Sequence, residues 1–297
     1  MKYLALFGLL SLALACGGAT DQPAPAAAER APLVAGPGTI AAPDGVEIAY
    51  TVSGEGSPAL VFIHGWMCDQ TFWAAQVKEF SGSNTVITID LPGHGLSGMD
   101  REGWPMMAYG ADVQAVVEHF GLNDVVLIGH SMGGPIALEA ARLMPDQVIA
   151  VVGVDSLQDA DMKYDPEQMK TYLGAFESDF LGACTKFSTS MFPEDADPEL
   201  VDRVMTAMCD GSPEIGITIM RQFIDYDMGA ALAAVDVPIR YINAGLYPTN
   251  TEANQRYNPD FSGVVVQDVG HFLMMEKPEV FNTLLGQMIA NLDSRAE

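Results

Sequence analysis

The chain has 297 residues, of which 49% are hydrophobic, and this is long enough for one large α/β domain with an inserted subdomain. Its 39 acidic residues outnumber 14 lysines and arginines, which gives a formal net charge of −25. Such a charge repels polyphosphates, so nucleic acid is excluded as an expected partner, and the acidity indicates a well-solvated surface.

The first 16 residues have the form of an export signal. Lys2 precedes an apolar run over residues 3–15, which is too short for a typical membrane span. The run ends in LALACG at 12–17, which resembles a bacterial lipoprotein signal, although Ala13 stands where leucine is favoured. This interpretation makes Cys16 the lipidated N-terminus of a lipoprotein in the bacterial cell envelope, whose only membrane contact is the lipid. The alternative is an ordinary cleaved signal peptide, and both interpretations predict an exported protein.

Residues 17–36 are rich in alanine, proline and glycine and lack hydrophobic periodicity. A segment of this composition cannot form a core, so we expect a flexible tether. If Cys16 is anchored, the tether holds the globular part away from the membrane surface.

Short apolar runs alternate with helical patterns along the rest of the chain. The predicted strands cover residues 38–42, 46–52, 59–63, 85–90, 124–129, 148–154, 238–242 and 263–269. The predicted helices cover residues 70–80, 106–119, 135–143, 251–257 and 278–291. Strands that alternate with helices and short Gly/Pro turns predict an α/β fold with a mostly parallel, doubly wound sheet.

Residues 156–235 interrupt this alternation. They contain several helical stretches, many Met, Phe and Asp residues and no clear strand. Some 80 residues is far more than one crossover connection needs, so we expect a helical cap inserted into the sheet domain. The core of the domain is then formed by residues 37–155 and 236–297.

The strand predicted at 124–129 leads directly into a G-x-S-x-G sequence, Gly129 to Gly133, and then into a helix. Strand, sharp turn and helix form the context of a nucleophile elbow. The glycines have a steric reason, because Ser131 must adopt a strained backbone and side chains two residues away would collide across the turn. The alternative interpretation is a glycine-rich turn with an incidental serine.

The cysteines at 68, 184 and 209 allow one disulfide in an oxidising compartment. Cys184 and Cys209 both fall in the cap segment and are the favoured pair, while three buried free thiols are the competing possibility. No C-x-x-C or His/Cys cluster suggests a metal, and no cofactor is expected.

Four motifs follow one another in the chain: HGW at 64–66, DLPGHGLSG at 90–98, GHSMGG at 129–134 and VGHF at 269–272. As a set they resemble the α/β-hydrolase family, in particular its capped branch of serine esterases, cofactor-free haloperoxidases and C–C bond hydrolases. The resemblance covers about residues 37–291.

The resemblance implies a role for individual residues. Ser131 becomes the nucleophile and His271 the general base, because a serine hydroxyl attacks well only when an imidazole takes its proton. The backbone N–H groups of Trp66 and Met132 become the oxyanion hole. The residues expected to shape the substrate pocket are His64, Gly65, Met67 and His130.

The acid of the triad departs from the commonest family pattern. The aspartate usually follows the strand predicted at 238–242, but the loop from Asn243 to Pro248 has no carboxylate. Part of the family places the acid at the end of the strand after the elbow helix, where this chain has Asp155. We therefore expect Asp155 to orient His271, with Asp159, Asp161 and Asn250 as weaker candidates; a helix N-cap is the alternative role for Asp155.

These expectations combine into a serine hydrolase that cleaves a small neutral or apolar ester, or a related acyl bond, through an acyl-enzyme. The alternatives are a cofactor-free haloperoxidase or a C–C hydrolase with the same triad, and a surface binding protein with a degenerate site. The sequence does not specify the acyl length or the oligomeric state.

Overall fold

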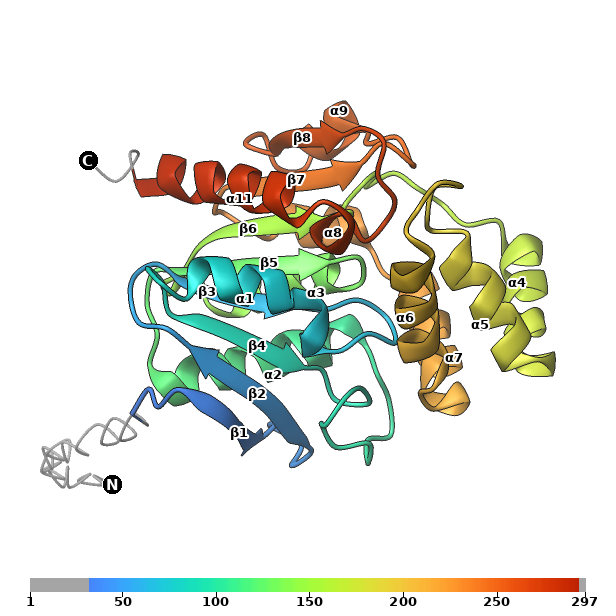
Figure 1. Cartoon of the computed structure of the whole chain (residues 1–297), viewed down its shortest axis with the longest axis horizontal. Helices are drawn as coiled ribbons and strands as arrows, with labels where there is room; N and C mark the ends of the chain where they lie inside the picture. The colour runs from blue at the N-terminus through green and yellow to red at the C-terminus, as the bar shows by residue number, and fades with distance from the viewer. Residues whose placement is uncertain (1–31, 294–297) are drawn as a thin grey trace, which may run out of the picture.

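A computed structural model describes residues 32–293. Its centre is an eight-stranded sheet in the order β1-β2-β4-β3-β5-β6-β7-β8 (Figure 1). The strands are β1 Gly36–Ala41, β2 Glu47–Ser53, β3 Ala59–Ile63, β4 Val86–Asp90, β5 Val125–His130, β6 Val148–Val154, β7 Ile239–Ala244 and β8 Ser262–Val266. β2 is antiparallel to both β1 and β4, and all other pairs are parallel. The predicted fold class is confirmed.

Helices cover both faces of the sheet. α1 and α11 contact each other on one face, and α3 contacts α2 and α8 on the other (Figure 1). The helices are η1 Gln70–Trp73, α1 Ala74–Phe80, α2 Met106–Phe120, α3 Gly133–Leu143, α4 Pro166–Ser178, α5 Phe180–Thr189, α6 Pro198–Cys209, α7 Pro213–Ile224, α8 Met228–Ala233, α9 Thr251–Gln255, α10 Leu273–Glu276 and α11 Pro278–Asp293. This double cover explains why β3, β4 and β5 are buried along their whole length.

α4 to α7 stand together beside the carboxyl end of the sheet, and we call these four helices the cap (Figure 1). α4, α6 and α7 each begin at a proline that follows Asp165, Asp197 or Ser212, whose side chain accepts a hydrogen bond from the first turn. An N-cap oxygen followed by proline is a strong helix start, so the local sequence sets these boundaries. α8 also lies within the segment 156–235, but it packs on α3.

A disulfide between Cys184 and Cys209 joins α5 to α6, and Cys68 is a buried free thiol. Of the two cysteine arrangements that the sequence leaves open, the structure therefore has the paired one.

One predicted strand ends earlier in the structure than expected, and the predicted export signal lies outside the described residues. The strand predicted to reach residue 269 ends at Val266, and Asp268 has a φ of 56°, which is incompatible with an extended strand. The signal-like residues 1–16, Cys16 and most of the predicted tether lie outside the described residues. Within residues 32–293, no helix is long and apolar enough to cross a membrane.

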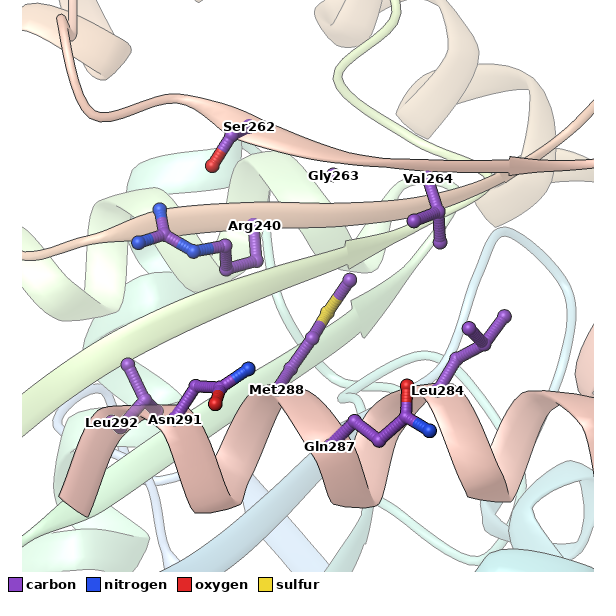
Figure 2. Close-up of a pocket in the computed structure, with 9 residues that line it drawn as sticks. All are labelled: Arg240, Ser262, Gly263, Val264, Leu284, Gln287, Met288, Asn291 and Leu292. Atoms are coloured by element: carbon purple, nitrogen blue, oxygen red, sulfur yellow. The ribbon is translucent and has the colours of Figure 1, made fainter. Parts of the chain in front are cut away.

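A pocket of about 520 Å³ lies between α11 and the strands β7 and β8 (Figure 2). It is lined by Arg240, Ser262, Gly263, Val264, Leu284, Gln287, Met288, Asn291 and Leu292. Arg240 and Ser262 are at the starts of their strands, so the pocket lies toward the amino end of the sheet. Ser131 and Asp155 follow the carboxyl ends of β5 and β6, at the opposite edge.

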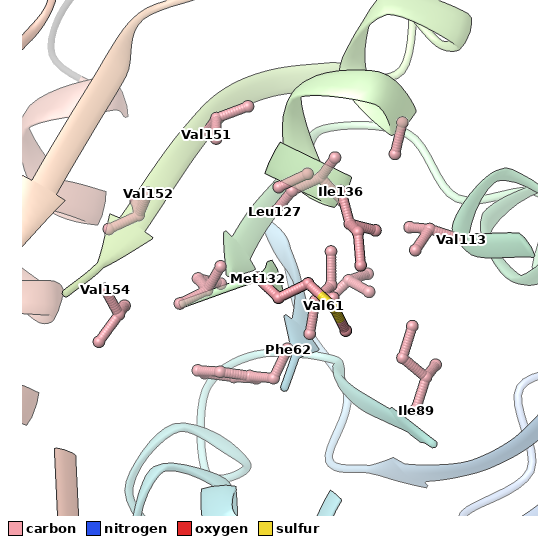
Figure 3. Close-up of a cluster of buried hydrophobic side chains, with 14 of the residues drawn as sticks. Val61, Phe62, Ile89, Val113, Leu127, Met132, Ile136, Val151, Val152 and Val154 are labelled. Carbon is pink, nitrogen blue, oxygen red and sulfur yellow. The ribbon is translucent and has the colours of Figure 1, made fainter. Parts of the chain in front are cut away.

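The hydrophobic core lies beneath that carboxyl edge. Val61, Leu127 and Val151 of three adjacent strands pack with Ile136 of α3 and with Met132, the residue after Ser131 (Figure 3). All five side chains are at most 4% exposed. The turn that carries Ser131 therefore rests on a fully buried, close-packed part of the molecule.

Candidate active site

Ser131 occupies the sharp turn between β5 and α3. Its φ is 53°, and its backbone N–H donates to the carbonyl of Val154 at 3.0 Å. A Cβ at Gly129 would lie 2.1 Å from the Gly133 carbonyl oxygen, and one at Gly133 would lie 2.4 Å from that of Ile63. Neither position has room for a side chain, which is the steric reason that the sequence suggested for the two glycines.

Asp155 and His271 meet at the carboxyl edge of the sheet. Asp155 directly follows β6, and its Oδ2 lies 2.5 Å from Nδ1 of His271. Its Oδ1 accepts a hydrogen bond from the Ala244 N–H at 2.8 Å, and the Asp155 side chain is fully buried. A carboxylate fixed in this way holds the proton of His271 on Nδ1, which leaves Nε2 as the basic nitrogen.

The other candidate acids have different partners. Asp159 accepts a hydrogen bond from Asn250 at 3.1 Å, and Asp161 contacts Arg256 and Tyr257. Of the four candidates that the sequence offers, the structure brings Asp155 to the imidazole.

The backbone around His271 is fixed from several sides. Its N–H donates to the Met191 carbonyl at 2.8 Å, and its own carbonyl accepts from Nε2 of His130 at 2.9 Å. The two carboxylate oxygens of Glu276 accept from the N–H groups of Gly270 and Phe272, at 2.8 and 3.1 Å. Neither Met191 nor Glu276 belongs to a motif, so neither contact could be predicted from the sequence.

The HGW loop lies against the serine. A Cβ at Gly65 would be 3.1 Å from Cβ of Ser131, so a side chain there would crowd the turn. In the described part of the chain, no hydrogen bond is donated by the backbone N–H of Trp66 or of Met132. Two unpaired N–H donors on either side of a serine can together stabilise an oxyanion.

Three of the residues expected to shape the substrate pocket have buried side chains with partners in the protein. Nε2 of His64 accepts from the Leu91 N–H at 2.9 Å, and its Nδ1 donates to the Gly65 carbonyl at 2.8 Å. His130 is 1% exposed and supports the His271 backbone. The side chain of Met67, 5% exposed, packs toward the cap. The deeply buried side chains of His64 and His130 support the loops of the site, and the role of these residues and of Met67 in shaping a substrate pocket stays a prediction.

Three buried histidines near the site are held neutral. Burial lowers the pKa of His64 to about 4 and that of His94 to about 3, and it lowers the pKa of His130 well below its usual range. In the unfolded chain histidine titrates at about pH 6.5, so below that pH the unfolded state binds more protons than the folded state. Stability is therefore present above about pH 6.5 and is lost as the pH falls toward the folded pKa values.

We expect the free energy of unfolding to fall by roughly 2 kcal/mol per buried histidine between about pH 7 and pH 5, partly offset by carboxylates whose pKa burial raises, such as Glu276. Urea unfolding at the two pH values measures this change. His94→Gln removes one of the three buried histidines, so the free energy of unfolding should change less between the two pH values. An equally steep dependence in that variant would contradict the assignment.

Comparisons with known proteins agree with this geometry. The pattern of the alpha/beta hydrolase family matches residues 60–284. The chain belongs to the alpha/beta hydrolase family. The predicted family is thereby confirmed, and the match covers the elbow, Asp155 and His271 in one continuous stretch.

Individual relatives of this alpha/beta hydrolase differ in activity. The 3-oxoadipate enol-lactonase 2 of Acinetobacter baylyi is 26% identical over 256 residues, which cover 82% of this chain and 93% of the relative. A non-heme haloperoxidase of Rhodococcus erythropolis is 43% identical over 96 residues, which cover 32% of this chain and 35% of the relative. Several curated relatives, the haloperoxidase among them, are matched over only about a third of their length, 29% to 35%.

Solved structures show the same fold. A thermophilic esterase of Thermogutta terrifontis superimposes with a TM-score of 0.76 at 24% identity, and the match covers 87% of this chain and 99% of the esterase. Together with the family match, these relatives support the prediction of a hydrolase enzyme. Among residues 32–293, no group of three or more His, Cys, Asp or Glu side chains is placed to hold a metal ion.

Proposed function

We propose that the protein is a serine hydrolase that cleaves a small neutral or apolar ester, or a related acyl bond, through an acyl-enzyme. The observation that carries the proposal is the 2.5 Å contact between Asp155 and His271 at the sheet edge where Ser131 stands on its strained turn. A buried carboxylate, an imidazole with one free nitrogen and a serine on an elbow are the parts of a Ser-His-Asp triad.

In the proposed reaction, Oγ of Ser131 attacks the ester carbonyl while Nε2 of His271 takes its proton. Asp155 stabilises the imidazolium, and the backbone N–H groups of Trp66 and Met132 stabilise the oxyanion. His271 then protonates the departing alcohol and leaves the acyl group on Ser131. A water molecule deprotonated by His271 attacks that acyl group and releases the acid.

Two features support an uncharged substrate. The Trp66 side chain and the cap aromatics Phe176, Phe180 and Phe187 form an apolar cluster next to the site. The net charge of −25 also disfavours the approach of anions. The lactonase relative supports the ester-type bond, according to its name, and does not bear on the charge of the substrate.

A panel of p-nitrophenyl esters with increasing acyl length tests the proposed reaction and identifies the preferred chain. We expect turnover of short and medium neutral esters and none of a dicarboxylate monoester at the same concentration. A protein that turns over none of the panel would contradict the proposal and favour a binding protein with a degenerate site.

The haloperoxidase relative favours a second activity of the same site. Hydrogen peroxide can replace water as the nucleophile that attacks the acyl-enzyme, which yields a peracid able to oxidise halide. An assay with acetate, peroxide and bromide detects this reaction, and a vinylogous diketone tests for C–C hydrolysis. An activity on either probe that exceeds ester turnover would replace the ester proposal.

We also propose that the chain is exported and anchored to a bacterial membrane through a lipid on Cys16, on the basis of the apolar run that ends at this cysteine. Expressed in a Gram-negative host, the protein should partition with membranes, and Cys16→Ala should release it. A wild-type protein that is already free in the periplasm would contradict the lipid anchor while leaving export intact.

A further inference from the structure

The cap contacts the loop that carries the proposed oxyanion donor. Nε1 of Trp66 donates to the Gly216 carbonyl of α7 at 2.9 Å, across the boundary between core and cap. A Cβ at Gly216 would lie 3.1 Å from the Trp66 ring and 3.0 Å from Sδ of Met67, so α7 packs directly on this loop. Met67 also packs against Gly211, in the middle of the α6–α7 connection (residues 210–212), and has a φ of 54°. A non-glycine residue in that conformation needs tight surroundings to hold it.

A second part of the cap contacts the loop of the proposed general base. Met191, in the linker between α5 and α6 (residues 190–197), accepts the hydrogen bond from the His271 N–H at 2.8 Å. The ring of Phe192 stacks on that of Phe272, with centroids 5.2 Å apart and planes 21° from parallel. A Cβ at Gly270 would lie 2.3 Å from the Met191 carbonyl oxygen. The linker therefore touches the residues on both sides of the histidine.

The disulfide joins these two contact regions through the chain. Cys184 lies on α5, the helix that leads into Met191 and Phe192. Cys209 is the last residue of α6. The short connection that follows it contains Gly211 and leads into α7, which contains Gly216. The covalent bond thus prevents the segment that holds the His271 loop from separating from the segment that holds the Trp66 loop.

We propose that the disulfide-braced cap is a positioning element, which holds the Trp66 backbone N–H and the His271 imidazole at a fixed separation on either side of Ser131. This inference rests on the proposed serine hydrolase function. The hydrogen bond between the Trp66 indole and Gly216 holds the backbone of the Trp66 loop. Met191 and Phe192 hold the backbone of the His271 loop. The proposed role of these contacts is on the loops and not on the substrate. Because oxyanion donors stabilise a transition state only at the correct place, a displacement of about 1 Å can lower the rate by roughly a hundredfold.

The decisive variants remove either the Cys184–Cys209 disulfide or the hydrogen bond of the Trp66 indole. Cys184→Ala/Cys209→Ala deletes the bond without adding polar atoms, and Trp66→Phe removes the indole N–H while keeping an aromatic ring. We expect each to lower kcat by about tenfold or more while KM stays within about threefold, with a parallel fall in the rate of fluorophosphonate labelling. Arg221→Ala is the matched control, because it breaks an exposed ion pair between α7 and Glu177 of α4 that reaches neither loop, and it should keep kcat.

Separate results would overturn the positioning role and the proposed function. A double-cysteine variant with a lower melting temperature but an unchanged kcat would show that the disulfide is only structural. If that variant does not fold, Trp66→Phe and Phe192→Leu decide, and an unchanged kcat in both overturns the positioning proposal. A wild-type protein without Ser131-dependent labelling refutes the serine hydrolase itself, whereas labelling at equal rates in wild type and variants refutes the positioning role alone.

Discussion

Ser131→Ala is expected to lower kcat for ester hydrolysis by a factor on the order of 10⁴ or more, because it removes the atom that bonds to the acyl group. The residual rate would come from the oxyanion donors and substrate binding alone. Alanine suits the position sterically, since it replaces one small residue by another at the same φ of 53°. The melting temperature should therefore stay close to that of the wild type.

Steady-state kinetics and a thermal melt on the same preparation check this prediction. Ser156→Ala is a useful control, because Ser156 also lies next to the turn and donates its hydroxyl proton to the Ser131 carbonyl at 2.6 Å. Ser156→Ala should lower the melting temperature while kcat stays close to that of the wild type. A Ser131→Ala enzyme whose kcat is within about tenfold of the wild-type value would rule out the triad.

Asp155→Asn is expected to lower kcat by roughly 10² to 10⁴. The amide cannot stabilise the imidazolium that forms during attack, and an amide N–H facing Nδ1 would favour the wrong tautomer of His271. The amide can still accept the Ala244 N–H with its oxygen, which preserves the buried hydrogen bond of 2.8 Å. The loss should therefore appear in turnover far more than in stability.

Asp159→Asn and Asn250→Ala are the matched controls, since these two residues contact each other rather than His271. Both should keep turnover within about threefold of wild type. If Asp155→Asn keeps most of its turnover, or if a control is more damaging, the acid has been assigned to the wrong residue.

Much of the fold could be predicted because its signals are local. Buried β-branched runs such as 59–63 and 148–154 become strands of the same extent. The G-x-S-x-G turn requires Gly129 for a steric reason that lies within the motif itself. Asp155 could be singled out because part of the family that the motifs resemble has its acid at the end of this strand. The carboxyl ends of parallel strands meet at one edge of the sheet, which makes that position plausible without knowledge of the side-chain packing.

The support around the site could not be predicted, because it depends on contacts between distant segments. The Met191 carbonyl meets the His271 N–H across 80 residues of sequence, and no motif marks a backbone carbonyl in a linker. The pairing of Cys184 with Cys209 depends on how α5 packs on α6, so composition left it open. The contact of His130 with the His271 backbone likewise joins segments 141 residues apart, and no local pattern indicates it.

Mass spectrometry of the intact protein tests whether Ser131 forms a covalent acyl-enzyme with the assistance of His271. The wild-type protein is mixed with a slowly deacylating p-nitrophenyl ester, quenched in acid, and digested to locate the adduct. We expect one acyl group on Ser131, formed together with a burst of p-nitrophenol and absent from Ser131→Ala. Ester turnover with no adduct, or with the adduct on another residue, would contradict it.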